Sequence, residues 1–310
     1  NNITTLSLDS DSSLLSIGGS AFYDNSINSL TIPNSVATID ASAFWNNTTL
    51  NNVIMPFDLS NLINDIFSAP LPSITYNLII HDGVTTISNS YYYDKSLSSV
   101  FIPNTVTDIC YQAFYNNNIT TLSFDSGSDL SSIGEEAFYD NSITSLEIPN
   151  SVTTIGSYAF QNNKTLTTLN FDSGSDLSSI GDYAFYKNDI SSLEIPNTVT
   201  EIKNSAFAYN YNLTSLTFLR DSSLLSIGNS AFYDNSITSL VIPNSVETIG
   251  DYAFWNNTNL TNVIMPYDLS NLKTNIFQNN PSITYSLIIP NGVTTISNYH
   301  YYDKRLSSVF

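Results

Sequence analysis

The chain has 310 residues and a formal charge of −19, from eight Lys plus Arg against 27 Asp plus Glu. This balance argues against nucleic-acid partners, because few basic side chains are present to neutralise phosphates, and against binding to anionic membrane surfaces. No apolar run approaches the roughly 18 residues that a membrane-spanning helix needs, so no membrane insertion is expected in this segment. The single cysteine, Cys110, cannot form an internal disulfide and is expected to be a small buried side chain.

An aromatic residue, usually preceded by Ala, recurs along the chain in steps of 22 to 25 residues. Repeats of this length are typical of solenoids and arrays, in which each unit packs only against its neighbours. The 42% of hydrophobic residues is enough for a continuous core along such an array. The recurring aromatic positions are Phe22, Phe44, Phe67, Tyr92, Phe114, Phe138, Phe160, Phe185, Phe207, Phe232, Phe254, Phe277 and Tyr301.

A longer period lies above this unit. Residues 51–62 return at 261–272, a shift of 210, and the sequence SSVF at 98–101 returns at 307–310. The two periods predict a single solenoid over residues 1–310, with about 13 coils of 22–25 residues. Because the first SSVF continues into IPNTV, we expect the chain to be a segment of a longer array.

A unit in the middle of the chain begins with a strand, in which Leu146 and Ile148 share the buried face. Pro149 ends this strand, because it has no N–H to donate to the ladder. Residues 157–160 are too few for a stable helix and are expected to form one helical turn, with Phe160 in the core. Stacking about fourteen such strands at roughly 4.8 Å predicts a parallel sheet along a rod roughly 60 Å long.

The unit L-x-x-L-x-I-P-N-x-V-x-x-I-G-x-x-A-F-x-N resembles the BspA-like (Treponema pallidum-type) leucine-rich repeat, and residues 145–163 and 239–257 are close to its consensus. The resemblance covers nearly the whole chain and implies a mainly β, right-handed leucine-rich-repeat solenoid. In such a solenoid the parallel sheet lines the concave face, and short strands and single helical turns form the other sides. The resemblance also implies an extracellular or cell-surface protein that adheres to host matrix proteins or to other cells.

The chain departs from the family just after the Ala-Phe turn. Family repeats often carry Gly-Cys there, whereas this chain carries Asn-Asn or Asp-Asn. Buried amides need hydrogen-bond partners. We therefore expect the second Asn of these pairs to bond to the backbone within the turn and to stack as a ladder, as at Asn47, Asn163 and Asn257.

No combination of residues in the repeats is typical of an active site. The two histidines, His81 and His300, have no nucleophile and acid placed beside them by the repeat, and we interpret both as turn or packing residues. Neither a Gly-rich phosphate loop nor a Cys/His metal spacing occurs. The sequence therefore predicts a protein that is not an enzyme and has no cofactor.

Two acidic loops have the sequence DSGSD, at 125–129 and again at 172–176, and lie 47 residues or two coils apart. Alternate Asp residues around a Gly resemble one arm of a calcium loop. Calcium takes roughly six to eight oxygen ligands, however, and each loop offers only two carboxylates. Solvated Asx-turns are the preferred interpretation, so no metal site is predicted.

The side chains that alternate with the buried Leu of each strand face solvent, and most are Ser, Thr or Asn. Two stretches are apolar instead, and each predicts a ladder of side chains about 5 Å apart on the open sheet. Exposed apolar patches often mark interaction sites, although β-branched residues also stabilise neighbouring strands. The candidate binding residues are Ile54, Ile79 and Phe101 in the first stretch, and Val241, Ile264, Ile288 and Phe310 in the second.

These features predict a non-enzymatic surface or secreted repeat protein that binds a protein or glycan, such as host matrix or the surface of another cell. The alternative is a structural spacer or fibre segment, whose exposed terminal strands pair head to tail between chains. An ice-binding solenoid is disfavoured, because the exposed Ser and Thr positions form no strict Thr array.

Overall fold

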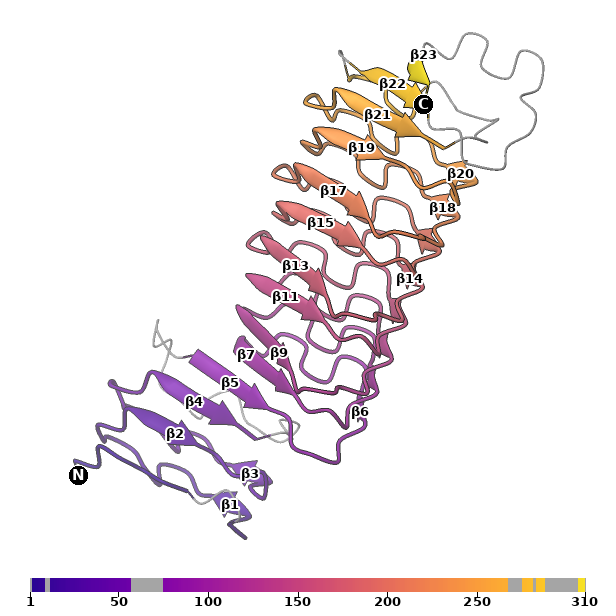
Figure 1. Ribbon diagram of the computed structural model, residues 1–310. Helices are drawn as coiled ribbons and strands as arrows, with labels where there is room; N and C mark the ends of the chain where they lie inside the picture. Colours follow the sequence, from indigo (N-terminus) through magenta and orange to yellow (C-terminus); the bar gives the residue numbers. More distant parts are fainter. Residues whose placement is uncertain are drawn as a thin grey trace.

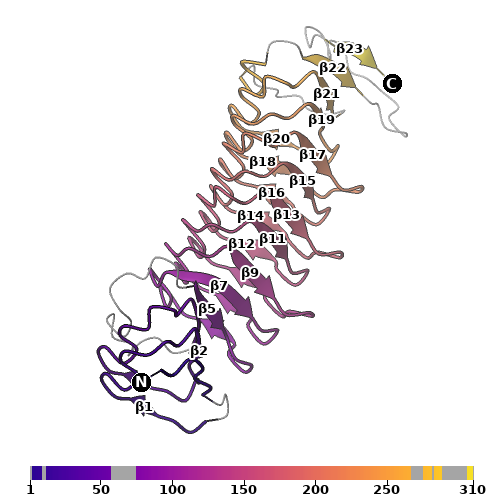
Figure 2. The same ribbon diagram turned by 90° about the vertical axis from the view of Figure 1, so that its left-hand side faces the viewer.

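The computed structural model describes residues 2–8, 12–56, 75–266, 275–280, 283–287 and 306–309. Over these residues the protein is an elongated β-solenoid without a helix, and its two termini lie at opposite ends of the rod (Figures 1 and 2). The strands pair in parallel with equivalent strands of neighbouring coils. The mainly β, parallel solenoid expected from the repeats is therefore confirmed.

The longer strands lie on one side of the solenoid, in a nine-stranded sheet followed by a four-stranded sheet, and we call the two together the open sheet (Figure 1). Buried and exposed residues alternate along them, as in β11, where Leu146 and Ile148 are buried and Glu147 is exposed. The nine strands are β2 (Ser29–Thr31), β4 (Asn52–Met55), β5 (Thr75–Ile79), β7 (Leu97–Ile102), β9 (Thr121–Phe124), β11 (Ser145–Ile148), β13 (Thr168–Phe171), β15 (Ser192–Ile195) and β17 (Ser215–Phe218). The four are β19 (Ser239–Val241), β21 (Asn262–Met265), β22 (Thr284–Leu287) and β23 (Leu306–Val309).

Two-residue strands form a second set of parallel sheets on another side of the solenoid, so the short strands that the family resemblance implied are present, although their positions were not predicted. Each of these strands ends in a buried Ile, while its first residue faces outward. Two residues are too few for an alternating pattern to be recognised in a sequence. The strands are β1 (Ser16–Ile17), β3 (Thr38–Ile39), β6 (Thr86–Ile87), β8 (Asp108–Ile109), β10 (Ser132–Ile133), β12 (Thr154–Ile155), β14 (Ser179–Ile180), β16 (Glu201–Ile202), β18 (Ser226–Ile227) and β20 (Thr248–Ile249).

The Ala-Phe segment forms hydrogen-bonded turns instead of the expected helical turn. Tyr158 and Asn162 have positive φ values of 59° and 65°, a backbone conformation that a right-handed helix does not contain. Their conformation turns alternate N–H groups out of the coil, so the N–H of Phe160 donates to the carbonyl of Ala184 in the next coil at 2.8 Å. Bonding between coils therefore replaces bonding within a helix.

The core contains a row of aromatic rings stacked along the rod. The centroids of Phe138 and Phe160 lie 5.2 Å apart with their planes 4° from parallel, and Phe160 and Phe185 repeat the arrangement at 5.2 Å and 7°. All three side chains are fully buried, as is the Ala that precedes each of them. The described aromatic positions that mark the repeat are thus core positions, except Phe22 and Phe277, which are partly buried and pack against the core.

Buried asparagines join successive coils beside this row. The Nδ2 of Asn163 donates to the carbonyls of Phe138 and Phe160 at 2.9 and 3.0 Å, and its Oδ1 accepts from the Ile143 N–H at 3.2 Å. Each amide thus bonds within its own turn and to the preceding coil, and the predicted amide ladder is confirmed. The same three bonds are made by Asn47, Asn210 and Asn257.

Cys110 differs from its predicted burial, because its side chain is only half-buried. It occupies the position that Gly156 holds in another coil, directly after a two-residue strand that ends in a buried Ile. Among the residues that the structure describes, no helix is long and apolar enough to cross a membrane.

Candidate ligand-binding face

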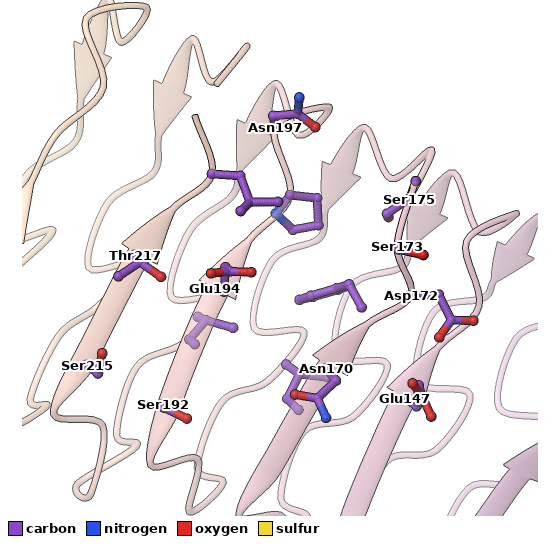
Figure 3. A pocket seen from close by; sticks show the side chains of 16 residues that line it. Glu147, Asn170, Asp172, Ser173, Ser175, Ser192, Glu194, Asn197, Ser215 and Thr217 are labelled. Atoms are coloured by element: carbon purple, nitrogen blue, oxygen red, sulfur yellow. The ribbon is translucent and has the colours of Figure 1, made fainter. Parts of the chain in front are cut away.

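Outward-facing side chains of the open sheet form a polar row across the middle of the solenoid. Glu147 of β11 lies opposite Asn170 of β13, and Glu194 of β15 lies opposite Thr217 of β17. All four are exposed, because the residues on either side of them in each strand take the buried face. Figure 3 shows these side chains on successive strands, all on the same face of the sheet.

The two acidic loops leave the sheet directly after β9 and β13 and stand beside this row, as Figure 3 shows for the loop at 172–176. Gly174 has a φ of 74°, a left-handed conformation that glycine adopts at little cost. The N–H of Asp176 donates to the carbonyl of Asn150 in the preceding coil at 2.8 Å. The loop at 125–129 is tied in the same way to the coil before it. Both loops are therefore fixed parts of the face.

Between the row and the loop at 172–176 lies a hollow of about 830 Å³. A second hollow of about 450 Å³ lies beside the loop at 125–129. Glu147, Asn170 and Asp172 line both, so the two hollows adjoin. We call them together the acidic groove, with Asp125, Glu147, Asp172 and Glu194 as its carboxylates.

The side chains of Glu147 and Asp172 lie next to one another in the groove, as Figure 3 shows. A hydrogen bond to Asp172, the charge of Asp172 and partial burial, in that order, raise the pKa of Glu147. Glu147 therefore keeps its proton to a higher pH than an isolated glutamate would. A basic group placed between the two would relieve their repulsion.

Neutralising cations are scarce across the described coils. There, the only ion pair within 4 Å joins Lys203 to Glu201 at 3.8 Å, and Glu201 belongs to β16 of the two-residue strands. No group of three or more His, Cys, Asp or Glu side chains in the described part of the chain is placed to hold a metal ion. The acidic groove therefore presents uncompensated negative charge to solvent.

The first predicted apolar ladder is interrupted. Ile79 and Phe101 are cross-strand partners, but Ile54 lies opposite Asn77 instead of Ile79. The prediction that the three apolar residues are consecutive neighbours was wrong at this step. Inward-facing residues set the register between β4 and β5, and they place Ile79 two positions beyond the partner of Ile54.

The second ladder is interrupted at the equivalent place. Val241 and Ile264 are cross-strand partners, and the side chain of Val241 is 55% exposed. The partner of Ile264 in β22 is Ser286, a polar residue. The remaining members of this predicted ladder, Ile288 and Phe310, lie outside the described residues.

A smaller hollow of about 270 Å³ marks the apolar part of the open sheet. It is lined by the first set of predicted binding residues, together with Asn77 and Ser99. Ile79 is 48% exposed, while Ile54 and Phe101 are half-buried. The predicted residues therefore share one shallow site, although they do not form a continuous ladder.

Of the two histidines, His81 lies at an exposed turn, where its Nδ1 is 2.7 Å from the carbonyl of Asp82. The other, His300, lies outside the described residues. The contacts of His81 are those of a turn residue.

Glu147 and Glu194 were not predicted as site residues. The pattern that could have identified them is a repeat at a shift of 47 residues. Residues 121–149 and residues 168–196 each contain a DSGSD loop and an LEIP strand. In the third copy of this pattern Leu219 replaces the first Asp of the loop and Val241 replaces the Glu. The acidic positions therefore recur in step in two adjacent copies and stop at the third.

The stacked coils, the buried core that they enclose and the parallel ladders between them define a leucine-rich-repeat solenoid. A sequence model described as the BspA type leucine rich repeat region (6 copies) matches residues 1–91, 85–214 and 178–307. The chain therefore belongs to the BspA-type leucine-rich-repeat family, as its motifs predicted.

Several solved structures are similar to this chain. The pneumococcal vaccine antigen PcpA is 16% identical, with 76% of this chain and 78% of that chain covered and a TM-score of 0.35. A leucine rich cell surface protein from Faecalibacterium prausnitzii is 20% identical, with 95% and 82% covered and a TM-score of 0.36. The leucine rich repeat protein of T. pallidum is 23% identical, with 61% and 74% covered and a TM-score of 0.38. No curated protein matches the chain.

Proposed function

We propose that this chain is a non-enzymatic, adhesin-like binding module, secreted or displayed at a cell surface, which holds a protein or glycan partner on its open sheet. The acidic groove carries this proposal, because ligand sites are usually preformed concave hollows in which a few placed polar groups set specificity. Membership of the BspA-type family is the ground for placing the protein outside the cell.

Rigidity supports binding through this face. The strands under the groove are joined by parallel backbone ladders, and the loops beside it are bonded to the neighbouring coil. A site that is ordered before binding loses little conformational entropy when the partner arrives. The nine strands of the larger sheet extend about 40 Å at roughly 4.8 Å per strand, which is long enough for a macromolecular partner.

The groove also contains the groups that recognise polar ligands. Carboxylates at Glu147 and Glu194, the amide of Asn170 and the hydroxyl of Thr217 accept or donate hydrogen bonds along one line. The apolar hollow around Ile79 offers a second contact area on the same face. We propose no catalytic role for any of these residues.

Binding of the protein to a panel of immobilised matrix proteins and glycans tests the proposal. The wild type is compared with a variant that carries Asn170→Arg and Thr217→Arg, which places two long side chains over the groove. The matched control carries Thr154→Arg and Thr248→Arg, which are exposed in the two-residue strands. We expect at least one partner to bind the wild type and the control, and to lose at least tenfold in affinity for the groove variant.

Binding that the groove variant retains in full would remove the open sheet from the proposal. If no partner binds and light scattering instead shows filaments that grow with concentration, the spacer or fibre function replaces the binding function. An additional Ile79→Asp variant separates the apolar hollow from the groove as the main contact.

A further inference from the structure

We propose that the acidic groove binds a basic polypeptide segment in the polyproline II conformation, with Lys or Arg at every third residue. This inference rests on the proposed function and names the class of partner. It is carried by the spacing of the groove carboxylates, their lack of cationic partners and the apolar side chains along the groove wall.

The groove repeats every two coils. Glu147 and Glu194 are 47 residues apart, as are Asp125 and Asp172, and each pair stands at equivalent positions of the coils. One strand, that of Asn170, lies between the two glutamates. At about 4.8 Å per strand, equivalent carboxylates are about 9.6 Å apart along the rod.

This spacing matches one conformation of an extended ligand. A polyproline II helix has about three residues per turn and rises about 3.1 Å per residue, so side chains three residues apart point the same way at about 9.3 Å. In a β-strand, side chains on one face are two residues and about 6.7 Å apart, and those three residues apart face opposite sides. A ligand strand therefore cannot place successive basic groups on both glutamates.

Charge complementarity selects the sign of the ligand. The groove carboxylates have no basic side chain within 4 Å in the described coils, and the Glu147–Asp172 pair repels itself until a proton or a cation joins it. The chain as a whole carries −19, which steers a basic segment toward it. A ligand that places an ammonium or guanidinium group beside each groove carboxylate therefore fits this site.

The walls of the groove suit the remaining residues of such a ligand. Phe171, which is half-buried, and Leu219, which is exposed, line the larger hollow and offer apolar surface to proline rings. Ser192 and Ser215 present hydroxyl donors to the ligand's carbonyls, which have no partner within a polyproline II helix. From β9 to β17 the groove spans four strand steps, about 19 Å, which is the length of about six ligand residues.

The test uses two synthetic nonapeptides, both acetylated and amidated, with the same composition. One is (Lys-Pro-Pro)3, and the other places its three lysines together before six prolines. Isothermal titration calorimetry at physiological salt measures their affinity for the full chain. We expect the repeating peptide to bind at least tenfold tighter than the clustered one, because only its lysines match the carboxylate spacing.

Two variants locate the binding. The double variant Glu147→Gln with Glu194→Gln is expected to bind the repeating peptide with an affinity at least tenfold lower than that of the wild type. The control, Glu135→Gln with Glu247→Gln, removes the same charge at exposed sites outside the groove and is expected to change affinity less than twofold. Equal affinity for the two peptides, or equal loss in the two variants, would overturn the proposal and leave only non-specific attraction to an acidic protein.

Failure here is distinguishable from failure of the proposed function. In one outcome, a matrix protein or glycan binds the wild type but not the Asn170→Arg and Thr217→Arg variant, and (Lys-Pro-Pro)3 does not bind. That result would keep the groove as a binding site and exclude basic polyproline II segments as its ligands. Binding of (Lys-Pro-Pro)3 with the expected variant profile supports the ligand class whether or not the panel contains the partner.

Discussion

Replacing Asn163 by alanine removes three hydrogen bonds from a site that is fully buried. Its Nδ2 donates to the carbonyls of Phe138 and Phe160, and its Oδ1 accepts from the Ile143 N–H. A methyl group satisfies none of these three backbone groups. Each unsatisfied buried polar group costs about 1–3 kcal/mol. At the lower end of this range, the three groups together lower the free energy of unfolding by about 3 kcal/mol.

Urea unfolding followed by far-UV circular dichroism measures this loss. Asn170→Ala is the matched control, because Asn170 is exposed on the open sheet and surface substitutions usually change stability by less than about 0.5 kcal/mol. Hydrogen exchange adds a local measurement, since the Ile143 N–H is expected to lose protection in Asn163→Ala. A loss below about 1 kcal/mol, or one equal to that of Asn170→Ala, would refute the role of the amide ladder in holding the coils together.

The other predictions concern the aromatic row, the close approach of coils and the carboxyl pair. Phe160→Ala is expected to cost about 3–5 kcal/mol in the same urea assay, and a loss under about 1 kcal/mol would mean that the ring row is not the core. In Gly181→Ala the new Cβ would lie 2.5 Å from the backbone of the preceding coil, so we expect the free energy of unfolding to fall by about 1–3 kcal/mol. Gly18→Ala is the control, because a Cβ at Gly18 meets no atom within 4 Å. Equal losses in the two variants would contradict this close packing of coils. Asp172→Asn is expected to lower the pKa of Glu147, measured by carbon NMR of its carboxyl. Because the pKa of Glu147 is raised in the folded chain, the contribution of Glu147 to stability falls as the pH rises through that pKa. The Asp172→Asn variant should show a smaller fall. An unchanged pKa of Glu147 in the variant would argue against an interaction between the two carboxyl groups.

Much of the fold was predictable because the repeat presents the same physical problem in each coil. Alternation around Leu146 indicated the strand, and the recurring Ala-Phe indicated the core row that contains Phe160. Asn163 was predictable as a ladder residue, because an amide that recurs beside a buried ring needs backbone partners. These features depend on one coil and its copies, and a sequence shows them directly.

The features that the sequence analysis missed depend on how coils contact one another. The left-handed conformation of Tyr158 accompanies a hydrogen bond from its N–H to the carbonyl of Asp182 in the next coil, which a pattern within one coil does not show. The register that separates Ile54 from Ile79 is set by inward-facing residues of two strands. Glu147 and Asp172 belong to different coils, and only their stacking brings the two carboxyl groups together in the groove.

The central claim, that a partner binds on the open sheet, is tested most directly by photo-crosslinking from single positions. A benzoylphenylalanine is placed at Thr217 in the groove or at Thr154 on the two-residue strands, and each protein is irradiated with the partner found in the binding panel. We predict crosslinks from Thr217 and none above background from Thr154. Crosslinks from Thr154 alone would place the partner on another side of the solenoid and contradict the claim.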